Sequence, residues 1–345
     1  MHIPEGKGEA IHVVYSVYDL SDIYNRHIGA SLTSLLFHSR EQIVVHLLYD
    51  EQLHKDDALY LQNRTRYHKL CRTFGAELVF HNVEIPEIFY SFRASKNLTV
   101  GTYYRLFIAD VLRDINKVIY IDGDIIINLD LSELWEMDLN KFALAARRDP
   151  EFHEIMLRHP KRIYAEYRTL PFTNDLLMNY FNAGFLCLNL QFIRDNYNLL
   201  SDSTNYLISH INTPRADQDA LNYLFGDKYI ALNPKYNLFP FEVADDINYC
   251  CIHYACRDRK PWFIYHDSID LQYWKYSLMS PWGENIDMQL NYMYGVANVS
   301  KSVMKYYGKL SVTENVSYII ALLLVIFKEY TIRLKNRWDI FVHKK

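Results

Sequence analysis

Strand-like and helix-like segments alternate along the first 121 residues, and this alternation constrains the possible folds more than any other feature. Short runs rich in β-branched residues predict strands at 12–17, 42–49, 76–80 and 117–121. Helical periodicity predicts helices at 23–37, 56–74 and 103–112. Strands that alternate with helices favour an α/β fold with a largely parallel sheet and helices on both faces. In such folds, ligands bind beyond the carboxyl ends of the strands.

Two carboxylates, Asp122 and Asp124, follow the last of these strands in the run YIDGDIIIN. Charged side chains are rarely buried without a partner, so these apolar surroundings call for one. Because Gly123 lies between them, both carboxylates can converge on one divalent cation, and oxygen ligands favour Mg²⁺ or Mn²⁺. The DxD pattern is common by chance, and a solvated Asp-Gly turn is the alternative. The hydrophobic neighbours favour the metal site.

Three further polar clusters lie downstream. Asn182 stands in YFNAGFLCLNL, before a strand-like run, and its amide offers a donor and an acceptor to a hydroxyl-rich ligand. The DQD run at 217–219 begins a helical pattern, where acids also serve as helix caps. In CIHYACRDRKPW, His253 is a candidate metal ligand, and Lys260 with a neighbouring arginine can neutralise phosphate.

A structural zinc site is the rival interpretation of the last cluster, because Cys250, Cys251, His253 and Cys256 are close in sequence. All four lie in one short segment, and no second CxxC-type pair closes the site, which disfavours zinc. The five cysteines are an odd number, and the N-terminus has no apolar leader. These two features predict a reduced, cytosolic protein.

The C-terminal part differs from the rest of the chain in charge. A net charge of -4 combines an acidic body with an excess of Lys and Arg from residue 328 onward. This distribution disfavours a nucleic-acid partner and favours a tail that meets an anionic surface. As a helix, the apolar run at 316–327 would be about 18 Å long, short of the roughly 30 Å bilayer core. We expect an interfacial membrane anchor, with a buried core helix as the alternative.

In this order, the four clusters resemble the retaining glycosyltransferases of family 8. The family pattern is a strand ending in DxD, then [YF]-x-N-[AS]-G, then DQD, then H-[FY]-x-G-x-x-K-P-W. This chain has DGD at 122–124, YFNAG at 180–184, DQD at 217–219 and HYACRDRKPW at 253–262. The stretch TYYRLFIAD is similar to the family helix whose arginine, here Arg105, faces the nucleotide-sugar. The C-terminal part, with SPW at 280–282 and a Tyr-rich basic extension, resembles the lipopolysaccharide-core branch of the family.

The resemblance implies a GT-A-like mixed sheet flanked by helices and followed by a helical extension. It predicts a catalytic domain at 1–275 and a basic, membrane-associating extension at 276–345. The implied reaction moves glucose or galactose, with retention, from a UDP-hexose donor to a lipopolysaccharide-core or similar glycan acceptor, assisted by Mn²⁺ or Mg²⁺. The implied location is cytoplasmic, peripheral on the inner face of the cell membrane.

The resemblance also implies roles for individual residues. The implied metal ligands are Asp122, Asp124 and His253. The implied donor-binding residues are Asp19, Arg105, Asp122, Asp124, Asn182, Ala183, Asp217, Gln218 and Lys260. Of these, Lys260 would add charge at the departing diphosphate. The implied catalytic residues, which line the transferred sugar, are Asp149, Asn182 and Gln218.

The chain departs from the family pattern at two loops. Family members open with a strand ending in an acid-acid-Asn-Tyr run that grips the nucleoside, whereas this chain reads YDLS and keeps only Asp19. Ala255 and Cys256 stand where the family has a glycine after the His-Tyr pair, and Lys260 lies one residue further on. The alternatives are a non-catalytic sugar-binding protein and a glycosyltransferase that acts on capsule or protein. The joint presence of DGD, Asn182, DQD, His253 and Lys260 favours an enzyme.

Overall fold

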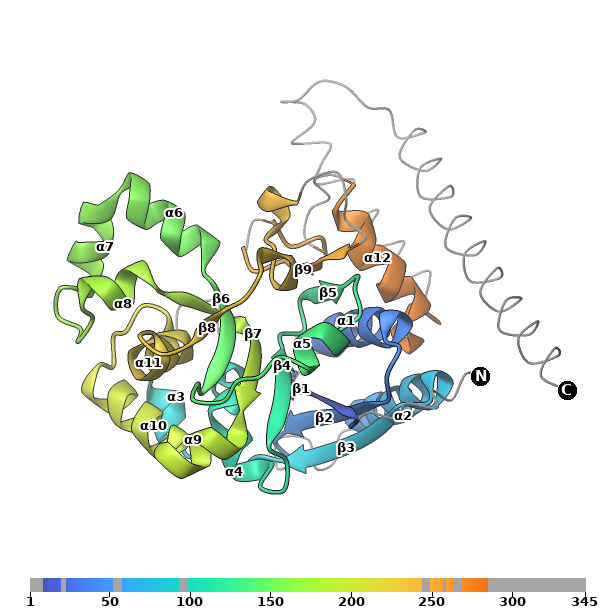
Figure 1. The fold of residues 1–345 in the computed structure, drawn as a ribbon. Helices are drawn as coiled ribbons and strands as arrows, with labels where there is room; N and C mark the ends of the chain where they lie inside the picture. The colour runs from blue at the N-terminus through green and yellow to red at the C-terminus, as the bar shows by residue number, and fades with distance from the viewer. Residues whose placement is uncertain are drawn as a thin grey trace, which may run out of the picture.

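The computed structural model describes residues 9–19, 23–51, 58–92, 99–243, 249–256, 259–262 and 268–284. Within these residues, a seven-stranded sheet forms the centre of the fold, in the order β3-β2-β1-β4-β7-β6-β8 (Figure 1). Its strands are β1 (Ile11–Val17), β2 (Ile43–Tyr49), β3 (Glu77–Asn82), β4 (Lys117–Ile121), β6 (Leu144–Arg148), β7 (Phe181–Asn189) and β8 (Ile230–Ala231). Strands β1 to β4 run parallel, whereas β7 is antiparallel to both β4 and β6.

Helices cover both faces of this sheet, as the sequence predicts. Val13 and Tyr15 of β1 pack with α1 (Tyr24–His38) and α2 (Ala58–Phe74) on one face. Val14 of β1 packs on the other face, because strand side chains alternate. That second face is covered by the 3₁₀-helix η2 (Val100–Phe107), α4 (Ile108–Val111), α9 (Leu190–Asn196), α10 (Leu199–Ser209) and α11 (Ala216–Phe225).

A second, smaller sheet pairs β5 (Ile125–Ile127) antiparallel with β9 (Cys251–His253). This pairing places the segment after β4 against a segment far along the chain. The remaining described helices are α3 (Ile88–Ser91), α5 (Ser132–Trp135), α6 (Pro150–Arg158), α7 (Pro160–Tyr167), α8 (Asn174–Met178), α12 (Asp270–Met279), η3 (Pro234–Tyr236), η4 (Pro240–Glu242) and η7 (Pro281–Glu284). Figure 1 shows α6, α7 and α8 grouped together, and α12 beside α1.

The predicted strands and the first two predicted helices are confirmed, with ends shifted by one or two residues. The helix predicted at 103–112 is present in two parts: η2 is a 3₁₀-helix, and only Ile108–Val111 are α-helical. A 3₁₀ turn brings residues three apart into line, and Arg105 Nε uses this to donate to the Thr102 carbonyl (3.2 Å). Asn182 lies inside β7 and not before it, because Phe181 already pairs with Arg148 of β6.

Residues 276–284 pack into the body of the protein. Helix α12 lies along α1, so the predicted domain boundary between residues 275 and 276 falls inside a helix. Trp282 is buried, its indole Nε1 donates to Asn63 Oδ1 (2.7 Å), and its ring contacts Tyr67. The rest of the predicted extension, with the apolar run at 316–327, lies outside the described residues, and the two-domain division stays a prediction. Among the described residues, no helix has both the length and the hydropathy needed to cross a membrane.

Candidate active site

The two sheets together bring Asp122, Asp124 and His253 to one place. Asp122 follows β4 directly, and its backbone N–H donates to the carbonyl of Gly184 on β7 (2.8 Å). The chain then turns into β5, where Ile125 pairs with His253 of β9. Backbone hydrogen bonds of two sheets therefore position all three side chains, beyond the carboxyl end of β4, where the sequence predicts the site.

These three residues form a cluster of metal-ligand type. His253 Nε2 lies 3.3 Å from Asp124 Oδ1 and 4.0 Å from Asp122 Oδ2. One ligand atom from each residue lies within 4.8 Å of the others, and no second cluster of this kind occurs in the described part of the chain. Two carboxylates with one imidazole suit a divalent cation such as Mn²⁺. The residues present therefore fit the metal that the sequence predicts.

Asn237 determines which nitrogen of His253 faces the aspartates. His253 Nδ1 lies 2.9 Å from Asn237 Oδ1, while Asn237 Nδ2 donates to Asn182 Oδ1 (3.0 Å). Because the amide oxygen only accepts, Nδ1 of His253 carries the proton and donates. Nε2 is then left with its lone pair toward Asp124. Such a partner on the far nitrogen is typical of histidines that bind metals.

Lys260 neutralises Asp124. Its Nζ donates to Asp124 Oδ2 and also lies 5.4 Å from the centre of the Trp262 ring. Burial favours the neutral form of Asp124, but the positive charge of Lys260 outweighs burial and lowers the pKa of Asp124. Asp124 is therefore ionised and holds a cationic side chain in a place that also suits a metal ion.

Arg105 neutralises the other aspartate. Its Nη2 lies 3.0 Å from Asp122 Oδ1, its Nε lies 2.9 Å from Asp217 Oδ2, and its Nη1 donates to the carbonyl of Ala183. The hydroxyl of Tyr120 donates to the same oxygen of Asp122 (2.8 Å). Burial opposes the charge of Arg105, but Asp122 and Asp217 outweigh it and raise its pKa. Arg105 thus orients Asp122, and its contact with a donor stays a prediction.

Amide side chains link Asp149 to the candidate metal-ligand residues Asp122, Asp124 and His253, which are called the metal cluster below. Asn237, which holds His253, donates to Asn182, and Asn182 Nδ2 donates to Asp149 Oδ2 (3.2 Å) and Gln218 Oε1 (3.3 Å). Gln218 Nε2 donates to the same oxygen of Asp149 (3.2 Å). The structure therefore brings the three residues predicted to be catalytic into one cluster, although their roles stay predictions.

The start of α6 holds Asp149 in this cluster. Asp149 Oδ1 accepts from the backbone N–H of Phe152 (2.9 Å), and Pro150 occupies the first turn. This is an N-cap interaction, and proline at the first helical position supports it. One carboxylate oxygen is tied to the helix, so the other is free to face the amides of Asn182 and Gln218.

Gly184 permits the close approach of the metal-ligand residues. A Cβ at this position would lie 2.3 Å from His253 Cε1 and 2.8 Å from Asp122 Oδ2. Neither atom can move far, because His253 is hydrogen-bonded on its far side and Asp122 is held by Arg105. The YFNAG run therefore needs a glycine at this position, because a larger residue would collide with His253 and Asp122.

Asp19 lies at the same edge of the sheet as Asp122, since β1 and β4 are parallel neighbours. Its Oδ2 accepts from the backbone N–H of Asn25 (2.7 Å) and from the Asn25 amide (3.1 Å), in the first turn of α1. Asp19 thus stabilises the connection from β1 to α1, and its predicted contact with a nucleoside stays a prediction.

The two aspartates of the DQD run serve different regions. Asp217 pairs with Arg105 at the site. Asp219 instead accepts from the hydroxyls of Tyr167 (2.7 Å) and Tyr180 (2.6 Å), which join α7 to the segment before β7. Neither residue is the N-cap of α11, so helix capping alone does not account for them.

The zinc interpretation finds no support among the described residues. Cys250 and Cys251 are buried in apolar clusters, and burial raises the pKa of the Cys251 thiol. Cys256 donates its thiol proton to Glu151 Oε2 (3.6 Å). All the described cysteines are free, and none belongs to the ligand cluster around His253.

Sequence reasoning missed two residues that contact the site, Tyr120 and Asn237. The signal for Tyr120 was present, because a residue two positions before Asp122 points to the same side of an extended chain. Asn237 carries no such signal. It follows η3, and only the tertiary fold brings its amide between His253 and Asn182.

The α/β fold, the acidic cluster beyond β4 and the polar cluster beside it define the class of protein, a glycosyltransferase of the GT-A type. Comparison with known proteins gives the family. Residues 16–264 match the family model described as Glycosyl transferase family 8. The chain therefore belongs to glycosyltransferase family 8.

Two relatives and one solved structure illustrate the likeness. General stress protein A of Bacillus subtilis is 28% identical over 236 residues, which cover 67% of this chain and 74% of the relative. A lipopolysaccharide 1,3-galactosyltransferase of Salmonella typhimurium is 24% identical over 251 residues, 68% of each chain. The crystal structure of galactosyltransferase LgtC in complex with donor and acceptor sugar analogs has a TM-score of 0.63 at 22% identity. That likeness covers 79% of this chain and 96% of LgtC, and it supports the fold.

Proposed function

We propose that the protein is a metal-assisted, retaining hexosyltransferase that moves glucose or galactose from a UDP-sugar to a lipopolysaccharide-core or similar glycan. The observation that carries this proposal is the cluster of Asp122, Asp124 and His253, with Nε2 of His253 turned toward the aspartates by Asn237. The Salmonella relative, a lipopolysaccharide galactosyltransferase by name, supports the choice of acceptor class.

In this proposal, Asp122, Asp124 and His253 hold Mn²⁺ or Mg²⁺, which supplies Lewis-acid stabilisation of the departing diphosphate. Lys260 exchanges its contact with Asp124 for the same diphosphate, where negative charge develops. Arg105 orients Asp122 through the 3.0 Å ion pair, and its charge favours the ionised form that burial opposes. Asp19, Ala183 and Asp217 belong to the proposed donor site as well.

Asp149, Asn182 and Gln218 are proposed to bind the hydroxyls of the transferred sugar. Retaining transfer ordinarily uses a carboxylate nucleophile near the anomeric carbon. Gln218, an amide, takes that position in the proposed mechanism, which favours attack from the face of the leaving group. The acceptor hydroxyl then forms the new glycosidic bond as the bond to UDP breaks, and the departing phosphate oxygen takes the hydroxyl proton.

The test is the release of UDP from a panel of UDP-sugars, with Mn²⁺ and with chelator, for the wild type and Asp124→Ala. We expect release that needs the metal and is abolished by Asp124→Ala, and the panel names the donor. Asp138→Ala, which removes an exposed acid outside the site, is the control. The anomeric configuration of the first product, read by NMR, tests retention. UDP release that is unchanged both by the chelator and by Asp124→Ala would refute the proposal.

We also propose that the protein is peripheral on the inner face of the cell membrane, held there by the C-terminal tail. The support is the apolar run at 316–327 followed by a basic excess. The test is co-sedimentation with anionic and neutral vesicles for the full chain and a chain ended at residue 315. Equal sedimentation of both chains with anionic vesicles would contradict this role of the tail.

A further inference from the structure

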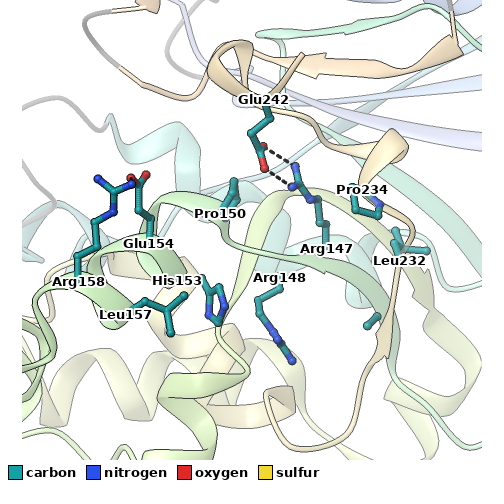
Figure 2. A pocket seen from close by; sticks show the side chains of 11 residues that line it. Arg147, Arg148, Pro150, His153, Glu154, Leu157, Arg158, Leu232, Pro234 and Glu242 are labelled. Carbon is teal, nitrogen blue, oxygen red and sulfur yellow. Dashed lines mark hydrogen bonds and ion pairs between the residues drawn. The ribbon is translucent and has the colours of Figure 1, made fainter. Parts of the chain in front are cut away.

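A pocket of about 570 Å³ lies beside the site and outside the metal cluster (Figure 2). Its walls come from the end of β6, from α6, from the segment after β8 and from η4. Charged and apolar side chains both line it, among them Arg147, Arg148, His153, Leu157, Leu232 and Pro234. The volume falls within the range of about 300–1,000 Å³ that is typical of small-molecule sites.

The positive charges of this pocket exceed its negative charges. Arg147 forms a bidentate ion pair with Glu242 (2.8 and 2.5 Å), drawn in Figure 2, and Arg158 pairs with an acid one turn earlier on α6 (3.3 Å). Arg148 donates to the amide oxygen of Asn179 (2.8 Å), and no carboxylate pairs with it among the described residues. Arg148 therefore leaves one uncompensated positive charge at the pocket.

His153 lies beside Arg148 in Figure 2 and adds a polar group in need of a partner. Its Nδ1 is buried and makes no hydrogen bond within the described residues. Burial and the charge of Arg148 lower the pKa of His153, which favours the neutral ring. Because Nδ1 is covered by protein atoms, a bound anion would accept its hydrogen bonds from Arg148 and from Nε2–H of His153, and charge-assisted bonds of this type are strong.

The pocket shares a wall with the predicted sugar site. Pro150 lines the pocket and directly follows Asp149. Arg147 Nη1, besides its pair with Glu242, donates to the backbone carbonyl of Asn237 (2.5 Å), whose side chain holds His253. The pocket is therefore connected to the site through Arg147 of β6 and Pro150 of α6.

We propose that this pocket binds the anionic group of the acceptor glycan, a carboxylate or a phosphate on a sugar near the one that receives the hexose. The inference rests on the proposed function. The donor diphosphate has its own counter-charges at the metal cluster, so Arg148 and His153 remain for the acceptor. The apolar side chains of Leu157, Leu232 and Pro234 supply surface for the C–H faces of a sugar ring.

Binding of three sugars to the full-length protein tests this proposal. Glucuronic acid carries a carboxylate, glucose 6-phosphate carries a phosphate, and glucose carries no charge. We expect at least one charged sugar to bind about tenfold or more tightly than glucose and to shift the NMR signal of the His153 ring. The His153 signal is assigned from its loss in His153→Gln. The charged sugar that binds more tightly identifies the chemical source of the anion.

Arg148→Gln is the decisive variant. Position 148 is exposed, so the change removes the charge without burying a polar group. We expect it to reduce the preference for the charged sugar about tenfold or more. Arg72→Gln, an exposed arginine on α2, is the matched control and should change nothing. Equal affinity for charged and neutral sugars, or a preference that Arg148→Gln leaves intact, overturns the proposal.

UDP binding with Mn²⁺ separates this proposal from the proposed function. Arg148→Gln should leave UDP binding unchanged, since Arg148 lies outside the metal cluster. If UDP binds but charged sugars show no preference, the pocket proposal is wrong and the function stands. If charged sugars bind but UDP does not, the function is wrong and the acceptor role of the pocket is wrong with it.

Discussion

Replacing Lys260 by methionine should make the free enzyme bind Mn²⁺ more tightly while it slows sugar transfer. In the structure, Lys260 Nζ donates to Asp124 Oδ2. Asp124 is one of the three candidate metal ligands. Oδ1 of the same carboxylate faces His253, so a cation that enters the cluster competes with the lysine charge for Asp124. Methionine keeps most of the length of the side chain, but it removes the competing charge.

The size of the effect follows from the burial of the pair. The side chains of Lys260 and Asp124 are 16% and 13% exposed, so solvent screens their attraction only in part. A hydrogen bond between charged groups contributes about 1.5–3 kcal/mol. Since about 1.4 kcal/mol corresponds to a tenfold change in affinity, Lys260→Met should tighten Mn²⁺ binding by about ten- to a hundredfold. Loss of the same charge at the diphosphate should lower turnover by about 10²–10³.

Titration of the full-length protein with Mn²⁺, without nucleotide, measures the affinity by calorimetry or by the EPR signal of the free ion. Lys235→Met is the matched control, because Lys235 also pairs with a carboxylate (2.5 Å), but Glu133 is 74% exposed and lies outside the site. The metal-free Lys260→Met protein should also unfold at a lower temperature, since Asp124 loses its partner, and Mn²⁺ should restore it. Unchanged or weaker Mn²⁺ binding in Lys260→Met would refute the competition.

Three other changes test separate parts of the structure. Gly184→Ala should weaken Mn²⁺ binding and lower turnover by about 10²-fold, because its Cβ displaces the His253 ring, while circular dichroism stays unchanged. His46 has its pKa lowered to about 3 by burial and by the neighbouring His81 and His12, so the folded state favours the neutral ring. The contribution of the neutral His46 ring to the free energy of unfolding is complete above the unfolded pKa of about 6.5 and falls by about 2 kcal/mol at pH 5. Urea unfolding of the wild type and of His46→Gln at pH 5 and above pH 6.5 measures it. A chain ended at residue 275 should be about 3–5 kcal/mol less stable than one ended at 284, because it lacks Trp282, and equal denaturation midpoints would instead support the predicted boundary.

The strands β1 to β4 were predictable because each is a short apolar run next to a helical pattern. Their parallel order follows from that alternation, and so does the placement of Asp122 and Asp124 at the carboxyl edge of the sheet. The proximity of His253 to this pair was predicted from chemistry, since two carboxylates in apolar surroundings need a partner. The structure adds the reason for it, which is the pairing of β5 with β9.

The rest of the sheet was not predictable from local patterns. Strand β6 ends in two arginines, β8 has only two residues, and the antiparallel placement of β7 depends on its contacts with β4 and β6. Local patterns also did not predict side-chain partners that come from distant segments of the chain. Asn237 is an ordinary loop asparagine in the sequence, and only the folded chain gives it His253 on one side and Asn182 on the other.

Asp122 and Asp124 of the site differ in their cationic partners: the partner of Asp122 is fixed in place, whereas the partner of Asp124 can be exchanged. Arg105 uses three nitrogens on Asp122, Asp217 and the Ala183 carbonyl, so moving it away would leave several buried groups without partners. Lys260 holds Asp124 through a single ammonium group. Under the proposed function, a metal that competes for Asp124 disturbs one ion pair and not a network, and the ammonium released in this way would be available to the diphosphate of the donor. The same lysine can thus serve the empty site and the loaded one without any change in the framework around Asp122.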